Sequence, residues 1–303
     1  MPLVKEISDA LQLPEIYLLK LARTASHCYK TYTIPKRAGG ERIIHHPSKE
    51  LKAIQRWLLE HVVTKWPVSP CAGAYVKGKN IADNARAHVS GRYLLRLDLS
   101  NFFPSITAED IRNYLDTHPP GVESWNPSDR EFFVSVVCRH DCLTVGAPTS
   151  PALSNTICFK LDSNLQQLAT AKGAVYTRYA DDLFFSSSTP NQLQIIENEV
   201  NQALRSLPFP KNLLLNSHKT HHSSKRSRRV VTGIILTSDN RVSVGRRRKR
   251  EIRVLIHRYG QLEHTQKRKL AGLLAFACDI EPDLINALIL KYGADSVAKA
   301  RKS

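Results

Sequence analysis

The chain has 303 residues, of which 42% are hydrophobic, so it is long enough to bury a substantial core. Its formal net charge of +17 excludes a predominantly acidic protein and favours a polyanionic partner such as a nucleic acid. No stretch approaches the roughly 18–20 apolar residues of a membrane-spanning helix, and the first residues do not resemble a secretory signal, so we expect a cytoplasmic protein without membrane contact.

Hydrophobic spacing predicts three elements in the N-terminal part of the chain. Residues 8–25 and 48–66 carry apolar side chains at helical spacing, and each stretch is expected to form a helix. Residues 32–46 surround a glycine pair and are expected to form a β-hairpin. The hairpin contains three basic residues, Lys36, Arg37 and Arg42.

The central part of the chain alternates between strand and helix signals. Strands are expected at 92–99 and 212–217, and a hairpin is expected at 174–187. Helices are expected at 107–117, 128–138, 151–170 and 191–206. The order strand, helices, hairpin, helix and strand is that of the split βαβ unit, so the sequence predicts an α+β fold.

The C-terminal part is predicted to be helical and is strongly basic. A second hairpin is expected at 230–237 and 241–244, and helices are expected from 246 onward with interruptions near Gly260 and Glu281-Pro282. Between residues 211 and 258 the chain has 14 Lys or Arg against two acids. Such a block is typical of a nucleic-acid contact, although a solvated basic face has the same composition.

Two short segments carry candidate metal ligands. Tyr179-Ala180-Asp181-Asp182 lies between apolar stretches, and two adjacent carboxylates on a hydrophobic hairpin need a cation to neutralise them. Asp98 ends the strand expected at 92–99, so three acids can gather around two Mg²⁺ ions, which prefer oxygen ligands and clamp an in-line phosphoryl displacement. A plain polar hairpin turn is the alternative.

A third segment opens a helix with a glycine before it. In Gly146-Ala147-Pro148-Thr149-Ser150-Pro151, Ser150 suits the N-cap and Pro151 suits the first turn. A helix start of this kind can approach a phosphate or a base closely.

These three segments, in this order, resemble the palm motifs of reverse transcriptases. The Asp98 strand is similar to motif A, residues 146–151 to motif B and residues 179–182 to motif C. Two further elements are similar to those of bacterial retron reverse transcriptases, namely Asn84-Ala85-Arg86-Ala87-His88 and Val231-Thr232-Gly233. The similarity runs from about residue 51 to the C-terminus.

The resemblance implies a right-hand polymerase fold with fingers, a ferredoxin-like palm and a small helical thumb. Residues 1–90 would form the fingers, and residues 91–235 the palm, with fingers insertions. Residues 236–303 would form the helical thumb and an RNA-binding region.

The resemblance also implies roles for the acids and for one lysine. Asp98, Asp181 and Asp182, with the backbone carbonyl of Leu99, would hold two Mg²⁺ ions. Lys219 matches a lysine that would stabilise or protonate the pyrophosphate leaving group.

Further residues are expected to bind the incoming deoxynucleoside triphosphate. Phe103 would be an aromatic steric gate under the sugar, with core packing as the alternative for one of the two adjacent phenylalanines. Gly146 would approach the nucleotide, while Arg37 and Arg42 would hold its triphosphate. Val145 departs from the family, which often has a glutamine there, and valine cannot supply that polar contact.

The remaining motif residues are expected to bind RNA. They are Asn84, His88, Val231, Thr232, Gly233, Arg246, Arg247, Arg248 and Arg250. Without the resemblance, the first two would be a helix cap and a packed imidazole, and Val231-Thr232-Gly233 a strand with a bulge.

A retron reverse transcriptase would copy part of its own structured non-coding RNA, the msr-msd transcript, into DNA. The family primes synthesis from the 2′-hydroxyl of an internal guanosine, retains the branched RNA–DNA product (msDNA), and acts in antiphage defence with a separate effector protein. Two alternatives remain at this point: another bacterial reverse transcriptase, from a group II intron or a diversity-generating element, and a non-catalytic RNA-binding scaffold on a polymerase fold.

Overall fold

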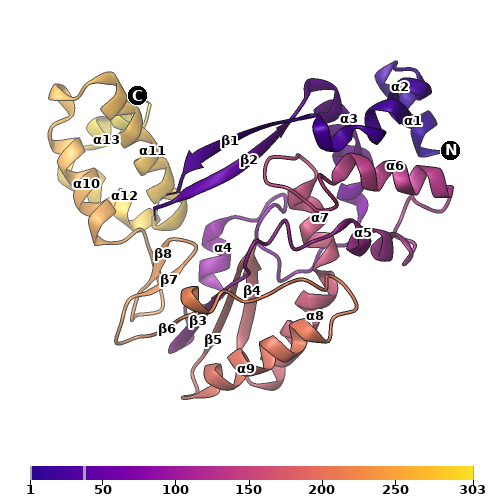
Figure 1. Cartoon of the computed structure of the whole chain (residues 1–303). Coiled ribbons are helices and arrows are strands. Elements are labelled where there is room, and N and C mark those ends of the chain that lie inside the picture. The colour runs from indigo at the N-terminus through magenta and orange to yellow at the C-terminus, as the bar shows by residue number, and fades with distance from the viewer. Residues whose placement is uncertain (1, 37–38, 303) are drawn as a thin grey trace.

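The computed structural model describes residues 2–36 and 39–302, which form a cupped, hand-like molecule (Figure 1). The N-terminal part contains α1 (Leu3–Leu11), α2 (Glu15–Arg23), η1 (Ala25–His27), β1 (Tyr29–Pro35), β2 (Glu41–Pro47), α3 (Lys49–His61) and η2 (Val63–Lys65). The single helix expected at 8–25 is two helices, because Pro14 cannot continue α1 and instead precedes α2. Helix α3 begins where predicted, with the Ser48 hydroxyl accepting from the Leu51 N–H at 3.3 Å.

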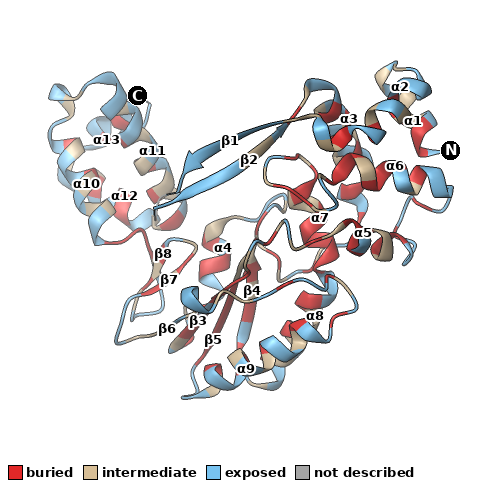
Figure 2. Ribbon diagram, viewed as in Figure 1, coloured by how far each residue is buried: buried red, intermediate tan, exposed pale blue. Residues whose placement is uncertain are grey.

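The predicted hairpin of β1 and β2 is longer than expected. It pairs in register from Tyr29 with Pro47 to Pro35 with Glu41. Its residues are mostly exposed, and it extends from the helices at the right of Figure 2 toward the C-terminal helices at the left.

The central sheet has the strand order β4-β5-β3-β6, with every neighbouring pair antiparallel. Its strands are β3 (Tyr93–Asp98), β4 (Val175–Tyr179), β5 (Asp182–Ser187) and β6 (His221–Ser224). The helices around it are α5 (Ala108–Leu115), α6 (Pro127–Val137), α7 (Ser150–Ile157), α8 (Phe159–Ala171) and α9 (Gln192–Arg205). This is the order of the split βαβ unit, so the predicted ferredoxin-like palm sheet is confirmed.

Three local predictions in this region are wrong. The helix expected at 151–170 is divided at Cys158 into α7 and α8. Ser150 is the first residue of α7 rather than its N-cap, and its hydroxyl accepts from the Thr144 N–H at 3.3 Å. The segment 212–217 is not a strand, because it pairs only through a bridge between Leu215 and Leu99, while β6 occupies the free edge of β3.

One helix, α4 (Ile81–Arg86), was not predicted as an element. A reciprocal capping box begins it: the Asn80 side chain accepts from the Asp83 N–H, and the Asp83 carboxylate accepts from the Asn80 N–H. The helix ends before His88, so that Asn84 and His88 do not share one helix face.

The C-terminal part has a small sheet and a bundle of helices. The sheet contains β7 (Arg229–Val231), β8 (Ile234–Leu236) and β9 (Val242–Ser243), in that order. Helices α10 (Arg246–His257), α11 (His264–Ile280), α12 (Pro282–Tyr292) and α13 (Ala294–Arg301) follow, with a short η4 (Tyr259–Gln261). The predicted interruptions at Gly260 and Glu281-Pro282 are confirmed, and the small sheet spans both sides of the limit expected between 235 and 236.

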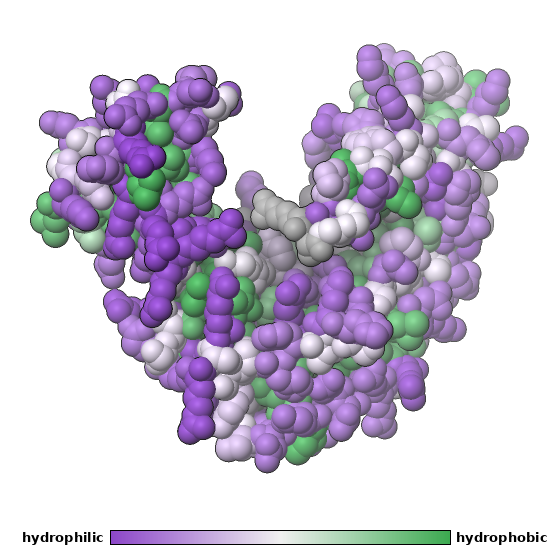
Figure 3. Space-filling model, turned by 60° about the vertical axis from the view of Figure 1, so that its left-hand side comes forward, coloured by the Kyte–Doolittle hydropathy of each residue, from purple (hydrophilic) through white to green (hydrophobic). Residues whose placement is uncertain are grey.

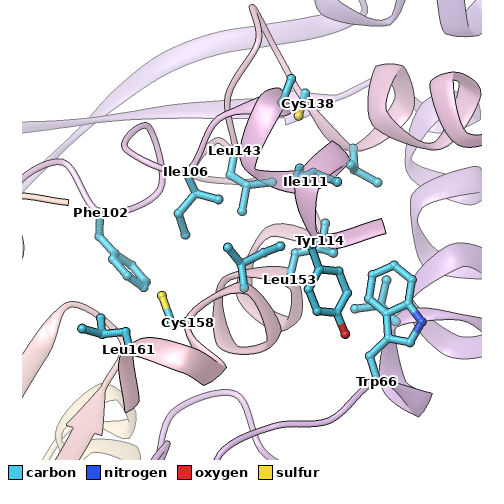
Figure 4. Close-up of a cluster of buried hydrophobic side chains, with 14 of the residues drawn as sticks. Trp66, Phe102, Ile106, Ile111, Tyr114, Cys138, Leu143, Leu153, Cys158 and Leu161 are labelled. Atoms are coloured by element: carbon cyan, nitrogen blue, oxygen red, sulfur yellow. The ribbon is translucent and has the colours of Figure 1, made fainter. Parts of the chain in front are cut away.

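Two hydrophobic cores lie on opposite faces of the central sheet. Leu95, Leu97 and Phe185 point into the larger core, which includes α1 to α3 and α5 to α9. Figure 4 shows Phe102 directed toward Cys158 and Leu161 in this core. Leu94 and Phe184 point into the second core, which joins α4, the β7-β8-β9 sheet and the C-terminal helices. Burial on both faces explains why these strands are apolar almost throughout.

No helix within residues 2–36 and 39–302 combines the length and the apolar character needed to cross a membrane.

Candidate active site

The three candidate acids meet at one end of the central sheet. Asp98 pairs in register with Asp182, and the Leu99 N–H donates to the Asp181 carbonyl at 2.8 Å. Tyr179 also pairs with Asp182, which leaves Ala180 and Asp181 as a two-residue turn with Ala180 in the left-handed region at φ 57°. The prediction that Asp98 lies beside this turn is confirmed.

Two basic side chains partly neutralise the acids. The Lys219 ammonium lies 2.9 Å from both carboxylate oxygens of Asp98, which is itself only 3% exposed. The Arg96 guanidinium donates to both oxygens of Asp182, at 2.9 and 3.2 Å. Lys219 thus lies at the acids, where its expected role at the leaving group stays a prediction, and Arg96 is an additional partner that the sequence did not indicate.

Burial and mutual repulsion still disfavour the negative charges of Asp181 and Asp182. Burial raises the pKa of Asp181, and the neighbouring Asp98 carboxylate raises it further. Burial raises the pKa of Asp182 to about 6, although Arg96 opposes the shift. Crowded carboxylates with raised pKa values are a common feature of sites that bind a cation.

The donor set fits a hard divalent cation. It consists of carboxylates together with the Leu99 carbonyl, which accepts no backbone hydrogen bond from the described residues. Within the described ranges, no three His, Cys, Asp or Glu side chains are already arranged as a metal site. The ammonium of Lys219 and the guanidinium of Arg96 instead supply the positive charge at Asp98 and Asp182.

Aromatic and basic side chains line the approach to the acids. Phe102 is buried in the larger core, whereas Phe103 is half-buried with its ring centroid 6.4 Å from that of Tyr75. Of the two adjacent phenylalanines it is therefore Phe102 that packs inward. Arg42 on β2 is close enough to lower the pKa of both Asp181 and Tyr75, while burial and Asp181 raise that of Tyr75. Arg37, the other expected triphosphate ligand, lies outside the described residues.

Tyr75 was missed by the sequence interpretation. Its backbone is in the left-handed region at φ 61° and its side chain is 51% exposed. A strained, exposed aromatic residue between Phe103, Arg42 and Asp181 is characteristic of a functional site. The sequence offered no signal for it, because Tyr75 lies in an irregular loop.

Gly146 has a packing role that is independent of any nucleotide contact. Its φ is 116°, and a Cβ at this position would lie 2.4 Å from the His45 carbonyl oxygen. The preceding Val145 carbonyl accepts from the His45 N–H at 2.8 Å. The loop before α7 is thus tied directly to β2, and any side chain at residue 146 would separate them.

His88 cannot contact RNA directly, which corrects that prediction. It is fully buried between the Ser186 and Thr177 hydroxyls, each 2.8 Å from one ring nitrogen, and burial lowers its pKa to about 3. Its neutral ring links the segment after α4 to the central sheet. Asn84 is also buried, and its side-chain amide has no hydrogen-bond partner among the described residues.

The predicted RNA-binding residues at the C-terminal side divide into two groups. Val231 is buried in the second core, and the Thr232 hydroxyl donates to the Ile81 carbonyl at 3.1 Å. Arg248 donates to the Gly233 carbonyl at 2.9 Å and lies over the Phe276 ring. The prediction that Val231 contacts RNA is corrected, because its side chain is fully buried, whereas Arg248 is half-buried and its guanidinium is already held by the protein.

The second group is exposed, and consists of Gly233, Arg246, Arg247 and Arg250. Figure 3 shows hydrophilic side chains gathered on the C-terminal part, beside a hollow that separates it from the N-terminal part. We refer to Arg246, Arg247 and Arg250 as the thumb arginines.

Comparisons with known proteins agree with this geometry. The family model described as "Reverse transcriptase (RNA-dependent DNA polymerase)" matches residues 34–258. Retron Ec83 reverse transcriptase of Escherichia coli is 38% identical over 98% of this chain and 97% of its own length. Retron Ec86 reverse transcriptase of Escherichia coli is 33% identical over 98% and 92%, and Retron Mx65 reverse transcriptase of Myxococcus xanthus is 33% identical over 88% and 65%.

Proposed function

We propose that this chain, which belongs to the retron reverse transcriptases, copies part of its own structured RNA into DNA at the site formed by Asp98, Asp181 and Asp182. The family makes it an RNA-directed DNA polymerase. The observation that supports the catalytic assignment is the register of β3 and β5, which brings Asp98 opposite Asp182 beside the Asp181 turn.

Two Mg²⁺ ions, held by the three aspartates and the Leu99 carbonyl, would supply Lewis-acid stabilisation of the charge that develops on the phosphates. Lys219, whose ammonium now contacts Asp98, is 56% exposed along its side chain and can turn to the pyrophosphate leaving group. There it would stabilise the departing charge or donate a proton to it.

Four residues would select and hold the nucleotide. Arg42 lies near the acids and would bind the triphosphate, as would Arg37. Phe103 presents its ring beside Tyr75 and would exclude a ribose 2′-hydroxyl. Gly146 would keep the loop before α7 close to β2 and leave room for the nucleotide.

We assign residues 1–90 to the fingers, 91–235 to the palm and 236–303 to the thumb. The small β7-β8-β9 sheet spans the limit between the palm and the thumb, and it shares a core with the thumb helices and with Leu94 and Phe184 of the palm sheet. The thumb arginines and the exposed turn at Gly233 would contact the RNA through its phosphates and shape. Asn84 and His88 are buried and would act indirectly: His88 fixes the segment after α4 to the central sheet, and α4 in turn holds the turn at Gly233 through the bond from Thr232 to the Ile81 carbonyl.

The retron assignment implies a particular substrate and product. The template would be the msr-msd RNA, priming would use the 2′-hydroxyl of an internal guanosine, and the product would be branched msDNA that remains bound. We place its action in the cytoplasm, in antiphage defence with a separate effector protein. The relatives named above are retron enzymes, which favours this assignment over an intron or diversity-generating enzyme.

A direct test uses the protein together with the RNA encoded beside its gene, deoxynucleoside triphosphates and Mg²⁺. The expected product is DNA that stays joined to RNA until a debranching enzyme releases it. Asp181→Asn should abolish synthesis and retain RNA binding, because the metals supply much of the rate enhancement.

The matched control is Asp116→Asn. Asp116 is a surface acid paired with Arg130 at 2.9 Å, and this variant should remain fully active. Substantial synthesis by Asp181→Asn would refute the catalytic assignment. Only unbranched products from the unaltered enzyme would refute the retron priming mechanism.

A further inference from the structure

A fully buried ion pair lies behind the catalytic turn. Arg178 and Asp162 are both 0% exposed, and they form two parallel hydrogen bonds: Nε to Oδ1 at 2.8 Å and Nη2 to Oδ2 at 2.7 Å. The Tyr176 hydroxyl also donates to Asp162 Oδ1, at 2.8 Å. Burial disfavours the charge of Arg178, but Asp162 outweighs this effect and raises the pKa of Arg178, so the guanidinium is charged.

The remaining donor of Arg178 faces the active site. Its Nη1 donates to the carbonyl oxygen of Ala180 at 3.3 Å and to Asn155 Oδ1 at 3.1 Å. Ala180 immediately precedes Asp181 and has a left-handed backbone that surrounding contacts must stabilise. Arg178 therefore contacts the turn at the peptide that determines where the Asp181 carboxylate points.

The same residue also fixes the loop that carries Tyr75. The Gly73 N–H donates to the Arg178 carbonyl at 2.8 Å, and the Arg178 N–H donates to the Cys71 carbonyl at 2.9 Å. Asn155, on α7, donates from Nδ2 to the Ala74 carbonyl at 2.7 Å. The guanidinium thus connects the catalytic turn with helices α7 and α8, and it reaches the loop before Tyr75 through Asn155, while the Arg178 backbone holds the same loop directly.

Stability alone does not account for such a pair. Removing two charges from water is costly, and an apolar pair of similar volume is often as stable or more stable. A charged pair with a bidentate geometry does, however, fix direction, because the planar guanidinium places its third nitrogen at a defined point.

We propose that the Arg178–Asp162 pair is a positioning device for DNA synthesis, which sets the orientation of the Asp181 turn and of the Tyr75 loop relative to α7. This inference rests on the proposed catalytic role of Asp181. Arg178 touches no reacting atom and acts through the turn.

The decisive variant replaces both charges, Arg178→Met together with Asp162→Leu. It leaves no unpaired buried charge, so it should fold with a melting temperature close to that of the unaltered protein. Its kcat should fall by about 10²-fold, the effect expected of a misplacement of about 1 Å, while KM for the template-primer stays unchanged. Mn²⁺ binding, measured by electron paramagnetic resonance without nucleotide, should weaken severalfold.

The matched control is Arg112→Met with Glu131→Leu. This pair is also bidentate, at 3.1 and 3.0 Å, but it lies on the surface between α5 and α6. It should leave kcat and Mn²⁺ binding unchanged. Arg178→Lys provides a second test that keeps the positive charge beside Asp162 but cannot also reach the Ala180 carbonyl, and its kcat should fall at least tenfold.

The outcomes separate this inference from the catalytic assignment. If Asp181→Asn is inactive but the folded double variant has normal kcat and Mn²⁺ binding, the pair only fills space and the inference is wrong. If the double variant does not fold, normal kcat in Arg178→Lys overturns the inference in the same way. Activity in Asp181→Asn would instead overturn the proposed site.

Discussion

Replacing the thumb arginines with alanine should weaken RNA binding and reduce its dependence on salt. Arg246, Arg247 and Arg250 are exposed on the first half of α10, where they can reach phosphates. Each phosphate contact contributes about 0.7–0.9 to the slope of log affinity against log salt, so losing three contacts should lower the slope by about 2–3.

Arg248 provides a control within the same helix. Its guanidinium donates to the Gly233 and Val244 carbonyls and lies over the Phe276 ring, 5.1 Å from the ring centre. Arg248→Ala should therefore leave the salt slope almost unchanged. It should lower the free energy of unfolding by about 1–2 kcal/mol, because it removes a cation–π contact and two hydrogen bonds.

The assay is filter binding or fluorescence anisotropy with the cognate RNA between 50 and 300 mM salt (roughly the range in which counterion release dominates). A generic primed RNA of equal length serves as the comparison. An unchanged slope in the triple variant would show that this face does not bind nucleic acid. Equal losses on both RNAs would show that the thumb arginines attract RNA without discriminating its shape.

Three further predictions concern the interior of the molecule. Gly146→Ala should lower activity, and it should lower the free energy of unfolding by about 1–3 kcal/mol, because the added Cβ would collide with the β2 backbone. Gly121 also has a positive φ but lies in open space, so Gly121→Ala should lower the free energy of unfolding by less. Equal losses of stability in the two variants would contradict the collision. Burial lowers the pKa of His88 to about 3. Below pH ~6.5 the His88 imidazole is therefore protonated in the unfolded chain but stays neutral in the folded chain. The free energy of unfolding should consequently fall by about 1.4 kcal/mol per pH unit down to pH ~3, and a denaturant series with His88→Gln should lack this component; identical pH profiles would contradict it. Phe103→Ala should raise ribonucleotide incorporation in a primer-extension assay, whereas Phe102→Ala should mainly cost about 3–5 kcal/mol of stability; unchanged sugar selectivity in Phe103→Ala would remove it as the gate.

Local sequence patterns predicted the elements that hydrophobic contacts define. The strand ending at Asp98 and the hairpin around Asp181 are apolar on both faces, so their signal was strong, and their order predicted the arrangement of the acids. Strand β6 has the sequence His221-His222-Ser223-Ser224, which lacks any apolar alternation. It is a strand only because it pairs with β3, and that long-range contact has no local signature.

The functions of individual charged residues were harder to predict, because they too depend on contacts between residues far apart in the chain. Arg248 belongs to a run of five basic residues that look equivalent in sequence, and four of them were expected to contact RNA. Of those four, Arg248 alone is held by backbone carbonyls and an aromatic ring. Arg178 is a charged residue within an apolar strand, and this was a usable signal of a buried partner. Its partner Asp162 lies 16 residues earlier on a helix and could not be identified without the fold.

The second core, which joins α4 to the C-terminal sheet and helices, limits how the RNA-binding regions of related enzymes can be exchanged. Helix α4 contributes Ala82 and Ala85 to the core of the C-terminal helices, and the Arg86 guanidinium donates to the Asp279 carbonyl on α11 at 3.1 Å. A chimaera that transplants only residues 229–303 would place foreign side chains against α4 of the recipient. A graft intended to transfer RNA preference should therefore include residues 80–91 from the same donor, although more than 130 residues separate the two segments in the chain.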